Sequence, residues 1–212
     1  MAATITAIQM HKALIGLCDT IEAQKDYLSE LDGAIGDGDH GVNMAKCFRG
    51  VREKLHMGDP SDVGAVLNVV GMEVMNSVGG AMGALYGTLF MRLAMTAGNK
   101  PDVGLDDLVA MFQAALEGVL SIGKAQVGDK TLVDTLSSAV TALKTAAQEG
   151  KPLEEALSDF DIAGQKGMAS TKDLLAKMGR ASRLGERTIG HQDAGATSCY
   201  FILQAFAQAP HV

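Results

Sequence analysis

The sequence predicts an all-α protein that forms one helical bundle or barrel. Helical periodicity runs through nearly the whole chain, and no stretch alternates apolar and polar residues for long enough to make a convincing strand. Hydrophobic residues make up 47% of the chain but aromatic residues only 4%, so Ala, Leu, Val, Ile and 12 Met must build the core, which favours closely packed helices. A length of 212 residues suits a single domain, which we place at residues 1–212.

Eight helical stretches are separated by clusters of Gly, Pro and Asp, which are residues that end helices. The first ends at the glycine-rich segment GAIGDGDHG, and the second begins after it. Ser61, which follows Asp59-Pro60, caps the third, and a Gly-Gly pair separates the third from the fourth. Asp106 and Asp107 open the fifth, while glycine-containing loops bound the last three. In order, the predicted helices cover residues 6–31, 41–55, 61–78, 82–97, 106–122, 131–148, 153–178 and 194–209.

Charge and cysteine content exclude several function classes. The net charge of −7 gives no electrostatic basis for binding nucleic acid. The three cysteines, Cys18, Cys47 and Cys199, lie far apart and include no CxxC pair, so neither a disulfide framework nor a zinc site is expected. The N-terminus lacks the basic region of a signal peptide. These features predict a protein of the reducing cytoplasm.

One uncharged stretch, Val74 to Met91, is just long enough to be considered as a membrane span. It contains Asn76, Ser77 and a Gly-Gly pair, which argue against one continuous helix. We therefore expect a buried part of the helical domain, and no membrane partner.

Three aspartates, Asp32, Asp37 and Asp39, lie within one short glycine-rich segment. Such a segment can fold tightly enough to bring carboxylates together. Clustered carboxylates repel one another unless a hard divalent cation lies between them, and Mg²⁺ prefers oxygen ligands that it shares with substrate phosphates. The segment therefore predicts a magnesium site that handles phosphate.

Other interpretations of this segment fit less well. Gly36, Gly38 and Gly41 match the G-x-G-x-x-G of a dinucleotide site, but a helix rather than a strand precedes them. An EF-hand loop that starts at Asp37 would place Val42 where glycine is required. A solvated turn with a helix-capping Asp explains one or two of the acids but not all three.

Several segments after the aspartates favour anions. His40 begins the next helix, and the backbone N–H groups of residues 41–43 lie at its N-terminus, where phosphate binds readily. A capping or packing histidine is the alternative. The glycine-rich loops at residues 79–83 and 128–131 could add backbone donors, although any one of them alone fits a simple turn better. Arg180 could hold phosphate oxygens during transfer, with a surface ion pair as the alternative.

Four segments taken together resemble the L subunit of dihydroxyacetone kinase, the nucleotide-binding component. They are GDGDHGVNM, GGAMGALYGT, GDKTLVDTL and GRASRLGERTIGHQDAGATS. The resemblance covers essentially the whole chain, with the motifs in family order and at similar spacing. It implies an eight-helix antiparallel barrel with ADP or ATP at one end, bridged to the protein by two Mg²⁺ ions.

The resemblance also implies a role for individual residues. Asp32, Asp37 and Asp39 would be the magnesium ligands, and Arg180 would be catalytic. The implied nucleotide site consists of His40, Gly41, Val42, Asn43, Ala81, Met82, Gly123, Leu132, Arg180, Asp193, Ala194 and Gly195.

Partners follow from the same resemblance. ATP-dependent members carry this domain behind a substrate-binding K domain, whereas a chain of this size resembles the separate L subunit of the phosphotransferase-dependent system. There, ADP stays bound and is recharged to ATP by a phosphohistidine on an M-type subunit, and the γ-phosphate passes to dihydroxyacetone held on a K subunit. The open alternatives are a subunit of an ATP-dependent kinase for another small ketose or polyol, and a non-catalytic nucleotide sensor that engages a transcriptional regulator.

The chain departs from the family pattern at three positions. Met82 and Ala84 stand where the family commonly has Ser and Pro, and Ala194 stands where Pro is usual. Loss of the serine hydroxyl removes one potential phosphate contact, but backbone donors survive any side-chain change. We therefore expect nucleotide binding to persist, and another small ketose or polyol stays open as the substrate.

Overall fold

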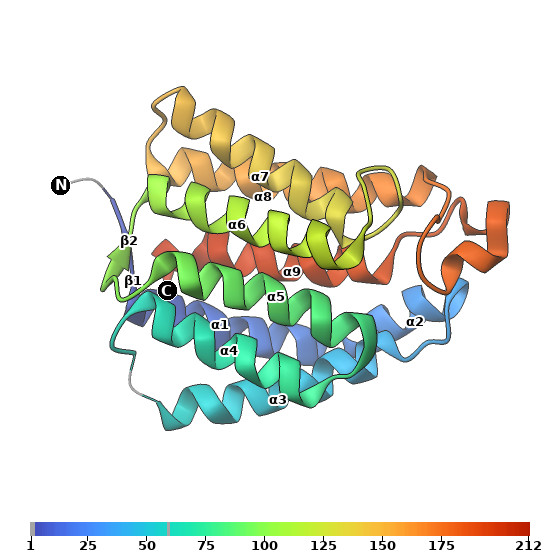
Figure 1. Ribbon diagram of the computed structural model, residues 1–212, viewed down its shortest axis with the longest axis horizontal. Helices are drawn as coiled ribbons and strands as arrows, with labels where there is room; N and C mark the ends of the chain where they lie inside the picture. Colours follow the sequence, from blue (N-terminus) through green and yellow to red (C-terminus); the bar gives the residue numbers. More distant parts are fainter. Residues whose placement is uncertain (1–2, 59) are drawn as a thin grey trace.

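The structure of the protein, a computed structural model, describes residues 3–58 and 60–212 (Figure 1). Within these residues there are nine α-helices, three 3₁₀ segments and two short antiparallel strands. The α-helices are α1 (Ala7–Ala23), α2 (Lys25–Ile35), α3 (His40–Met57), α4 (Val63–Ser77), α5 (Gly80–Ala97), α6 (Leu105–Gly123), α7 (Leu132–Gln148), α8 (Leu153–Ser170) and α9 (Ala194–Gln208). The other elements are β1 (Ile5–Thr6), β2 (Asp102–Val103), η1 (Thr171–Asp173), η2 (Ala181–Thr188) and η3 (Ala209–His211).

Eight of these α-helices close a ring. From α1 to α3 and on through α9, each helix packs against the next, and α9 returns to α1. The remaining helix, α2, packs mainly against α3 and α9 at one end of the ring. In Figure 1, α2 and the segment that leads into α9 lie at the right-hand end, away from β1 and β2. The all-α prediction is confirmed, while the eight-helix antiparallel barrel that the resemblance implied stays a prediction.

The predicted first helix is wrong in its bounds, because two helices replace it. Gln24 ends α1 with φ −95° and ψ 7°, and the following helix, α2, packs mainly against α3. This second helix continues to Ile35, beyond the predicted end at Leu31. The first two aspartates of the predicted metal site are therefore held differently: Asp32 lies within α2, and Asp37 follows it.

The predicted seventh helix is also too long, since α8 ends at Ser170 rather than near Met178. Thr171 is fully buried, and its Oγ1 donates to the Met168 carbonyl at 2.7 Å and accepts from the Asp193 N–H at 3.1 Å. This tertiary contact holds the chain in a 3₁₀ turn at the point where local periodicity continues.

Smaller differences occur at two other places. Asp62, rather than the predicted Ser61, caps α4, because its carboxylate accepts from the Ala65 N–H at 2.6 Å. Asp59, part of the predicted helix boundary, lies outside the described residues. The paired strands β1 and β2 were not expected, and each is too short to leave an alternating pattern.

The core is mainly aliphatic, as the composition predicts, with a small aromatic centre. Phe112 of α6 packs against Phe160 of α8 and Phe206 of α9, with ring centroids 4.8 and 5.0 Å apart. Met10 and Met44 are among the largest fully buried side chains. Flexible methionine side chains fill the irregular space between helices that few aromatic residues occupy.

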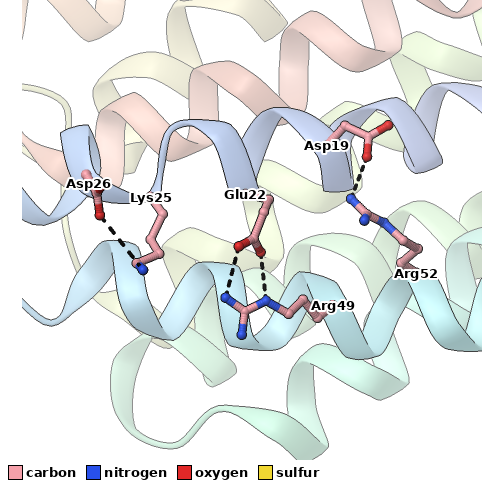
Figure 2. Close-up of polar contacts among 6 residues, drawn as sticks. All are labelled: Asp19, Glu22, Lys25, Asp26, Arg49 and Arg52. Carbon is pink, nitrogen blue, oxygen red and sulfur yellow. Dashed lines mark hydrogen bonds and ion pairs between the residues drawn. The ribbon is translucent and has the colours of Figure 1, made fainter.

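Ion pairs join α1 to α3 on the outside of the ring (Figure 2). Arg49 donates two hydrogen bonds to the Glu22 carboxylate, at 2.8 and 3.0 Å, and Arg52 donates one to Asp19 at 2.6 Å. Pairs as exposed as these contribute little stability. They do favour one alignment of α3 along α1, and α3 begins where the aspartate segment ends.

The uncharged stretch Val74–Met91 is not one helix, as expected. It is divided between α4 and α5 by a break at residues 78–79. In the part of the chain that the structure describes, no helix has the length and apolar character needed to cross a membrane.

Candidate functional site

A cavity of about 600 Å³ lies at the end of the ring where α2 is found. Its wall is formed by α2, the first residues of α3, α5, α7 and α9, the end of α6 and the start of η2. The volume falls within the range of roughly 300–1,000 Å³ that is usual for small-molecule sites. The cavity is therefore large enough to take a nucleotide.

The three aspartates converge at this cavity. One carboxylate oxygen each from Asp32, Asp37 and Asp39 can be chosen so that all three lie within 4.8 Å of one another. Asp32 is half-buried, whereas Asp37 and Asp39 are exposed. At this separation one cation can contact all three groups, and an all-oxygen donor set is the one that Mg²⁺ prefers. The residues present fit a hard divalent cation.

Glycines between α2 and α3 make this convergence possible. Gly38 has a φ of +76°, a conformation that side chains rarely adopt. A Cβ atom at Gly36 would lie 2.3 Å from Asp32 Oδ1, so only glycine lets that carboxylate fold over the backbone. A Cβ atom at Gly41 would lie 1.9 Å from the Lys25 carbonyl oxygen, so glycine is also needed where α3 meets α2.

The guanidinium of Arg180 reaches into the carboxylate cluster. Its Nη1 pairs with Asp37 and lies 3.8 Å from an Asp39 oxygen. The Arg180 side chain is 62% exposed, so water and salt screen this pairing. A positively charged group thus already lies beside the aspartates, which is further evidence that they favour a cation.

Four helix N-termini face the cavity, but only two of them are capped by side chains. Thr131 Oγ1 accepts from the Val133 N–H at 3.1 Å at the start of α7, and Asp193 accepts from the Ala196 N–H at 2.7 Å at the start of α9. Among the described residues, no side chain caps α3 or α5 in this way. At the start of α3 the His40 N–H donates to Asp32 at 3.3 Å, whereas Gly80, Ala81 and Met82 at the start of α5 line the cavity, where N–H groups of a helix N-terminus favour an anion.

Lys130 is a buried charged residue in the wall, with 3% of its surface exposed. Its ammonium donates to the carbonyls of Thr171 and His191 and so ties the start of α7 to the loop before α9. Its φ of +61° is rare for a residue other than glycine. The Asp134 carboxylate holds the same loop by accepting from the Thr131 N–H at 2.8 Å.

Burial shifts the pKa values of several groups in the wall, Asp193 and His40 among them. The pKa of Asp193 is raised to about 6, mainly because burial disfavours the charged carboxylate, although a helix N–H and Lys130 offset part of this effect. Burial lowers the pKa of His40, and the neighbouring aspartates offset part of that shift. The direction of this shift favours the neutral imidazole.

The cavity brings together most of the sequence-predicted nucleotide residues. Those in its wall are His40, Asn43, Ala81, Met82, Gly123, Leu132, Arg180, Asp193, Ala194 and Gly195. Gly41 and Val42 are not part of the wall as the described residues define it. Gly41 is buried against α2, and the Val42 side chain is 51% exposed.

The positions that depart from the family pattern also lie in this wall. Met82 is half-buried and packs against the hydrophobic core. Its side chain is therefore not directed only into the cavity. Ala84 is exposed and Ala194 is buried.

Sequence reasoning missed Lys130 as a site residue, and it missed the buried hydroxyls of Tyr86 and Ser198. Nothing local in the sequence marks a lysine or a hydroxyl as buried next to a cavity.

Comparison with known families gives a match that agrees with this geometry. The model of the DAK2 domain matches residues 34–208, which is most of the chain. The chain belongs to the DAK2 domain family.

This DAK2 domain has relatives of similar length. It is 41% identical, over 90% of its own length and 91% of the relative's, to the ADP-binding subunit DhaL of the PEP-dependent dihydroxyacetone kinase of Escherichia coli. It is 38% identical, over 90% and 91%, to the ADP-binding subunit DhaL of the PTS-dependent dihydroxyacetone kinase of Lactococcus lactis. A longer relative, the human triokinase/FMN cyclase, is 30% identical over 94% of this chain but only 35% of its own.

Solved structures resemble the DAK2 domain in fold. The dihydroxyacetone kinase of C. freundii in complex with AMP-PNP and Mg²⁺ superposes with a TM-score of 0.71 at 20% identity, over 98% of this chain and 35% of that one. Its native form gives a TM-score of 0.72 at 22% identity. These likenesses support the helical ring found here.

Proposed function

We propose that this protein is the nucleotide-binding subunit of a dihydroxyacetone kinase. It holds ADP or ATP through two Mg²⁺ ions in the cavity and transfers the γ-phosphate to dihydroxyacetone on a separate K subunit. One observation carries the proposal: three converging carboxylates lie beside two helix N-termini whose N-cap residues make no side-chain cap, and among the described residues only the His40 N–H there is bonded to a side chain. Carboxylates that hold a metal, next to N–H groups that hold an anion, make a site for metal-bridged phosphate.

The rest of the wall suits the remainder of a nucleotide. Apolar side chains of Leu85, Val119, Ile122 and Met178 line the cavity and can pack against a base. The glycine-rich start of α5 can let its N–H groups approach phosphate closely, because no side chains intervene at Gly79 and Gly80. Met82 replaces a hydroxyl but leaves its own backbone N–H, so nucleotide retention does not depend on the missing serine.

Charge neutralisation is the main task of the site's residues in phosphoryl transfer. Asp32, Asp37 and Asp39 would hold the metal, and bound Mg²⁺ would neutralise and orient the phosphate oxygens. Arg180 supplies a further positive charge on an exposed side chain at the cavity edge. Once a cation takes its place at the carboxylates, the guanidinium is available to donate to the transferring phosphoryl group.

The proposed partners follow from the similar subunits. The relatives of matching length are ADP-binding subunits of PEP- or PTS-dependent kinases, so we propose that a phosphohistidine-donating subunit recharges ADP in place. A second candidate is a subunit or domain of a kinase for another small ketose. The 32% identity to an L-erythrulose kinase over 91% of this chain favours it. A contact with a transcriptional regulator is a further proposal.

The metal assignment is tested with Asp37→Asn and the matched control Asp26→Asn. Both changes remove one negative charge, but the Asp26 side chain is 98% exposed and lies outside the cavity wall. We expect Asp37→Asn to abolish Mg²⁺-dependent ADP binding in equilibrium dialysis while the helical circular dichroism is unchanged, and Asp26→Asn to bind as the wild type does. Unchanged ADP binding in Asp37→Asn would overturn the metal assignment.

The mode of phosphoryl supply is tested in two steps. Denaturation of the purified protein should release ADP, which chromatography detects, because a recharged cofactor must stay bound between turnovers. Reconstitution with a dihydroxyacetone-binding subunit and a phosphohistidine donor should then give dihydroxyacetone phosphate without added ATP. A product that forms only with added ATP would favour the ATP-dependent candidate, and no product under either condition would favour a nucleotide sensor.

A further inference from the structure

A chain of hydrogen bonds at the cavity wall connects three helices. The Tyr86 hydroxyl of α5 donates to the Gly195 carbonyl at 2.8 Å and lies 2.7 Å from Ser198 Oγ of α9. Ser198 Oγ in turn lies 2.8 Å from Nε2 of His40 at the start of α3. Tyr86 is 2% exposed and Ser198 is fully buried, so water does not compete for these contacts.

Counting hydrogens assigns a direction to each bond in this chain. A carbonyl oxygen only accepts, so the single Tyr86 hydroxyl hydrogen goes to Gly195. The 2.7 Å contact with Ser198 must then use the Ser198 hydrogen, with Tyr86 as acceptor. Ser198 has no hydrogen left for His40, so Nε2 of His40 must be the donor. The alternative Ser198 contacts to the Ala194 and Gly195 carbonyls are longer, at 3.1 and 3.2 Å.

We infer that Tyr86 and Ser198 are positioning residues that hold His40 as its Nε2–H tautomer, with Nδ1 left as a hydrogen-bond acceptor. A neutral imidazole has one donor and one acceptor nitrogen, so fixing one nitrogen fixes the other. In this tautomer Nδ1 offers a lone pair, which suits a metal-bound water or a ribose hydroxyl rather than a bare phosphate oxygen.

The same chain fixes the relative positions of three parts of the wall. His40 also donates its backbone N–H to Asp32 at 3.3 Å, so the imidazole anchor and a carboxylate of the cluster are linked through one residue. Tyr86 belongs to the helix that follows the Gly-Gly break, and Gly195 belongs to the turn at the start of α9. A loosened Ser198 contact would therefore move groups on α3 and α9 that face the nucleotide.

Ser198 offers a clean test because its side chain does not line the cavity as the described residues define it. Any effect of Ser198→Ala on a ligand must be transmitted through a neighbour. Thr135→Val is the matched control: Thr135 is equally buried and donates to the Ala196 carbonyl of α9 at 3.0 Å, but it makes no described contact with His40. Each variant loses one buried hydroxyl that contacts a backbone carbonyl in the first turn of α9.

The tautomer itself is measured without any nucleotide. Two-bond ¹H–¹⁵N spectra of the ¹⁵N-labelled protein distinguish the two neutral tautomers, recorded at about pH 8, where imidazoles are neutral. The His40 signals are assigned by their loss in His40→Gln. We expect the Nε2–H pattern in the wild type and a mixed pattern in Ser198→Ala. An Nδ1–H pattern in the wild type would overturn the inference, whatever the protein binds.

The consequence for ligand binding rests on the proposed function. We expect Ser198→Ala to weaken Mg²⁺-ADP binding about two- to tenfold, the range that follows from losing one buried hydrogen bond, and Thr135→Val to leave it unchanged. In a His40→Ala background Ser198→Ala should add nothing, since both changes break the same connection. Wild-type affinity in Ser198→Ala, or an equal loss in both backgrounds, would overturn the positioning role. A wild type that does not bind Mg²⁺-ADP would instead overturn the proposed function, while the tautomer result would stand.

Discussion

Replacing Arg180 with alanine should tighten the binding of Mg²⁺ to the nucleotide-free protein. The guanidinium pairs with Asp37 and lies 3.8 Å from Asp39, so a cation that enters the cluster must displace it. The three side chains are 62%, 43% and 53% exposed, so the contact has the strength of an exposed ion pair, about 0.2–1 kcal/mol. Since about 1.36 kcal/mol corresponds to a factor of ten, the dissociation constant for Mg²⁺ should fall about 1.5- to 5-fold.

Isothermal titration calorimetry with MgCl₂ measures this change directly. The gain should shrink as ionic strength rises, because salt screens an exposed pair. Arg183→Ala is the matched control, since it removes the same charge from the same segment, and Arg183 has no described ion pair with the carboxylates. The reasoning would be refuted if Arg180→Ala bound Mg²⁺ no more tightly than the wild type, or if Arg183→Ala gave an equal gain.

The same variant should act in the opposite direction on phosphoryl transfer. In the proposed function, Arg180 would neutralise charge on the transferring group once metal and nucleotide are bound. Its loss should slow transfer in the reconstituted system on the order of 10²-fold or more, as for other donors that act on developing charge. A wild-type transfer rate, together with wild-type nucleotide binding, would reduce Arg180 to a surface residue.

Two further predictions concern stability. Burial raises the pKa of Asp193 to about 6, above its value of about 3.9 in an unfolded chain. The stability that the protonated Asp193 carboxyl contributes is therefore present below pH 4 and is lost as pH rises through 6. Relative to Asp193→Asn, the wild type should lose at most about 3 kcal/mol of unfolding free energy between pH 4 and 7 in urea titrations without Mg²⁺; a pH-independent difference would contradict this. Gly41→Ala should destabilise the protein by several kcal/mol, roughly the cost of forced overpacking against the Lys25 carbonyl. In the control Gly16→Ala, the added Cβ meets nothing within 4 Å, so this change should stabilise helix α1 by up to about 1 kcal/mol. Equal melting temperatures for Gly41→Ala and Gly16→Ala would show that the α2–α3 contact is not tight.

Helix content and most helix bounds could be predicted because they depend on local features. Periodicity and glycine breaks placed α3, α5, α6, α7 and α9 within a few residues of their observed bounds. The failures lie where a distant contact decides the conformation. Buried Thr171 ends α8 through a hydrogen bond with the backbone of Asp193, a residue far along the chain, which no local pattern could show.

The sequence by itself determined the type of fold and predicted the chemistry of the site. Apolar spacing dictates helices, and three carboxylates in one glycine-rich segment predict a cation site, because both effects act over a few residues. Only the tertiary structure decided that Arg180 reaches Asp37, that Lys130 is buried between two loops, and that Ser198 of α9 meets His40 of α3. These contacts join residues far apart in the chain, so their existence depends on how the helices pack and not on any local preference.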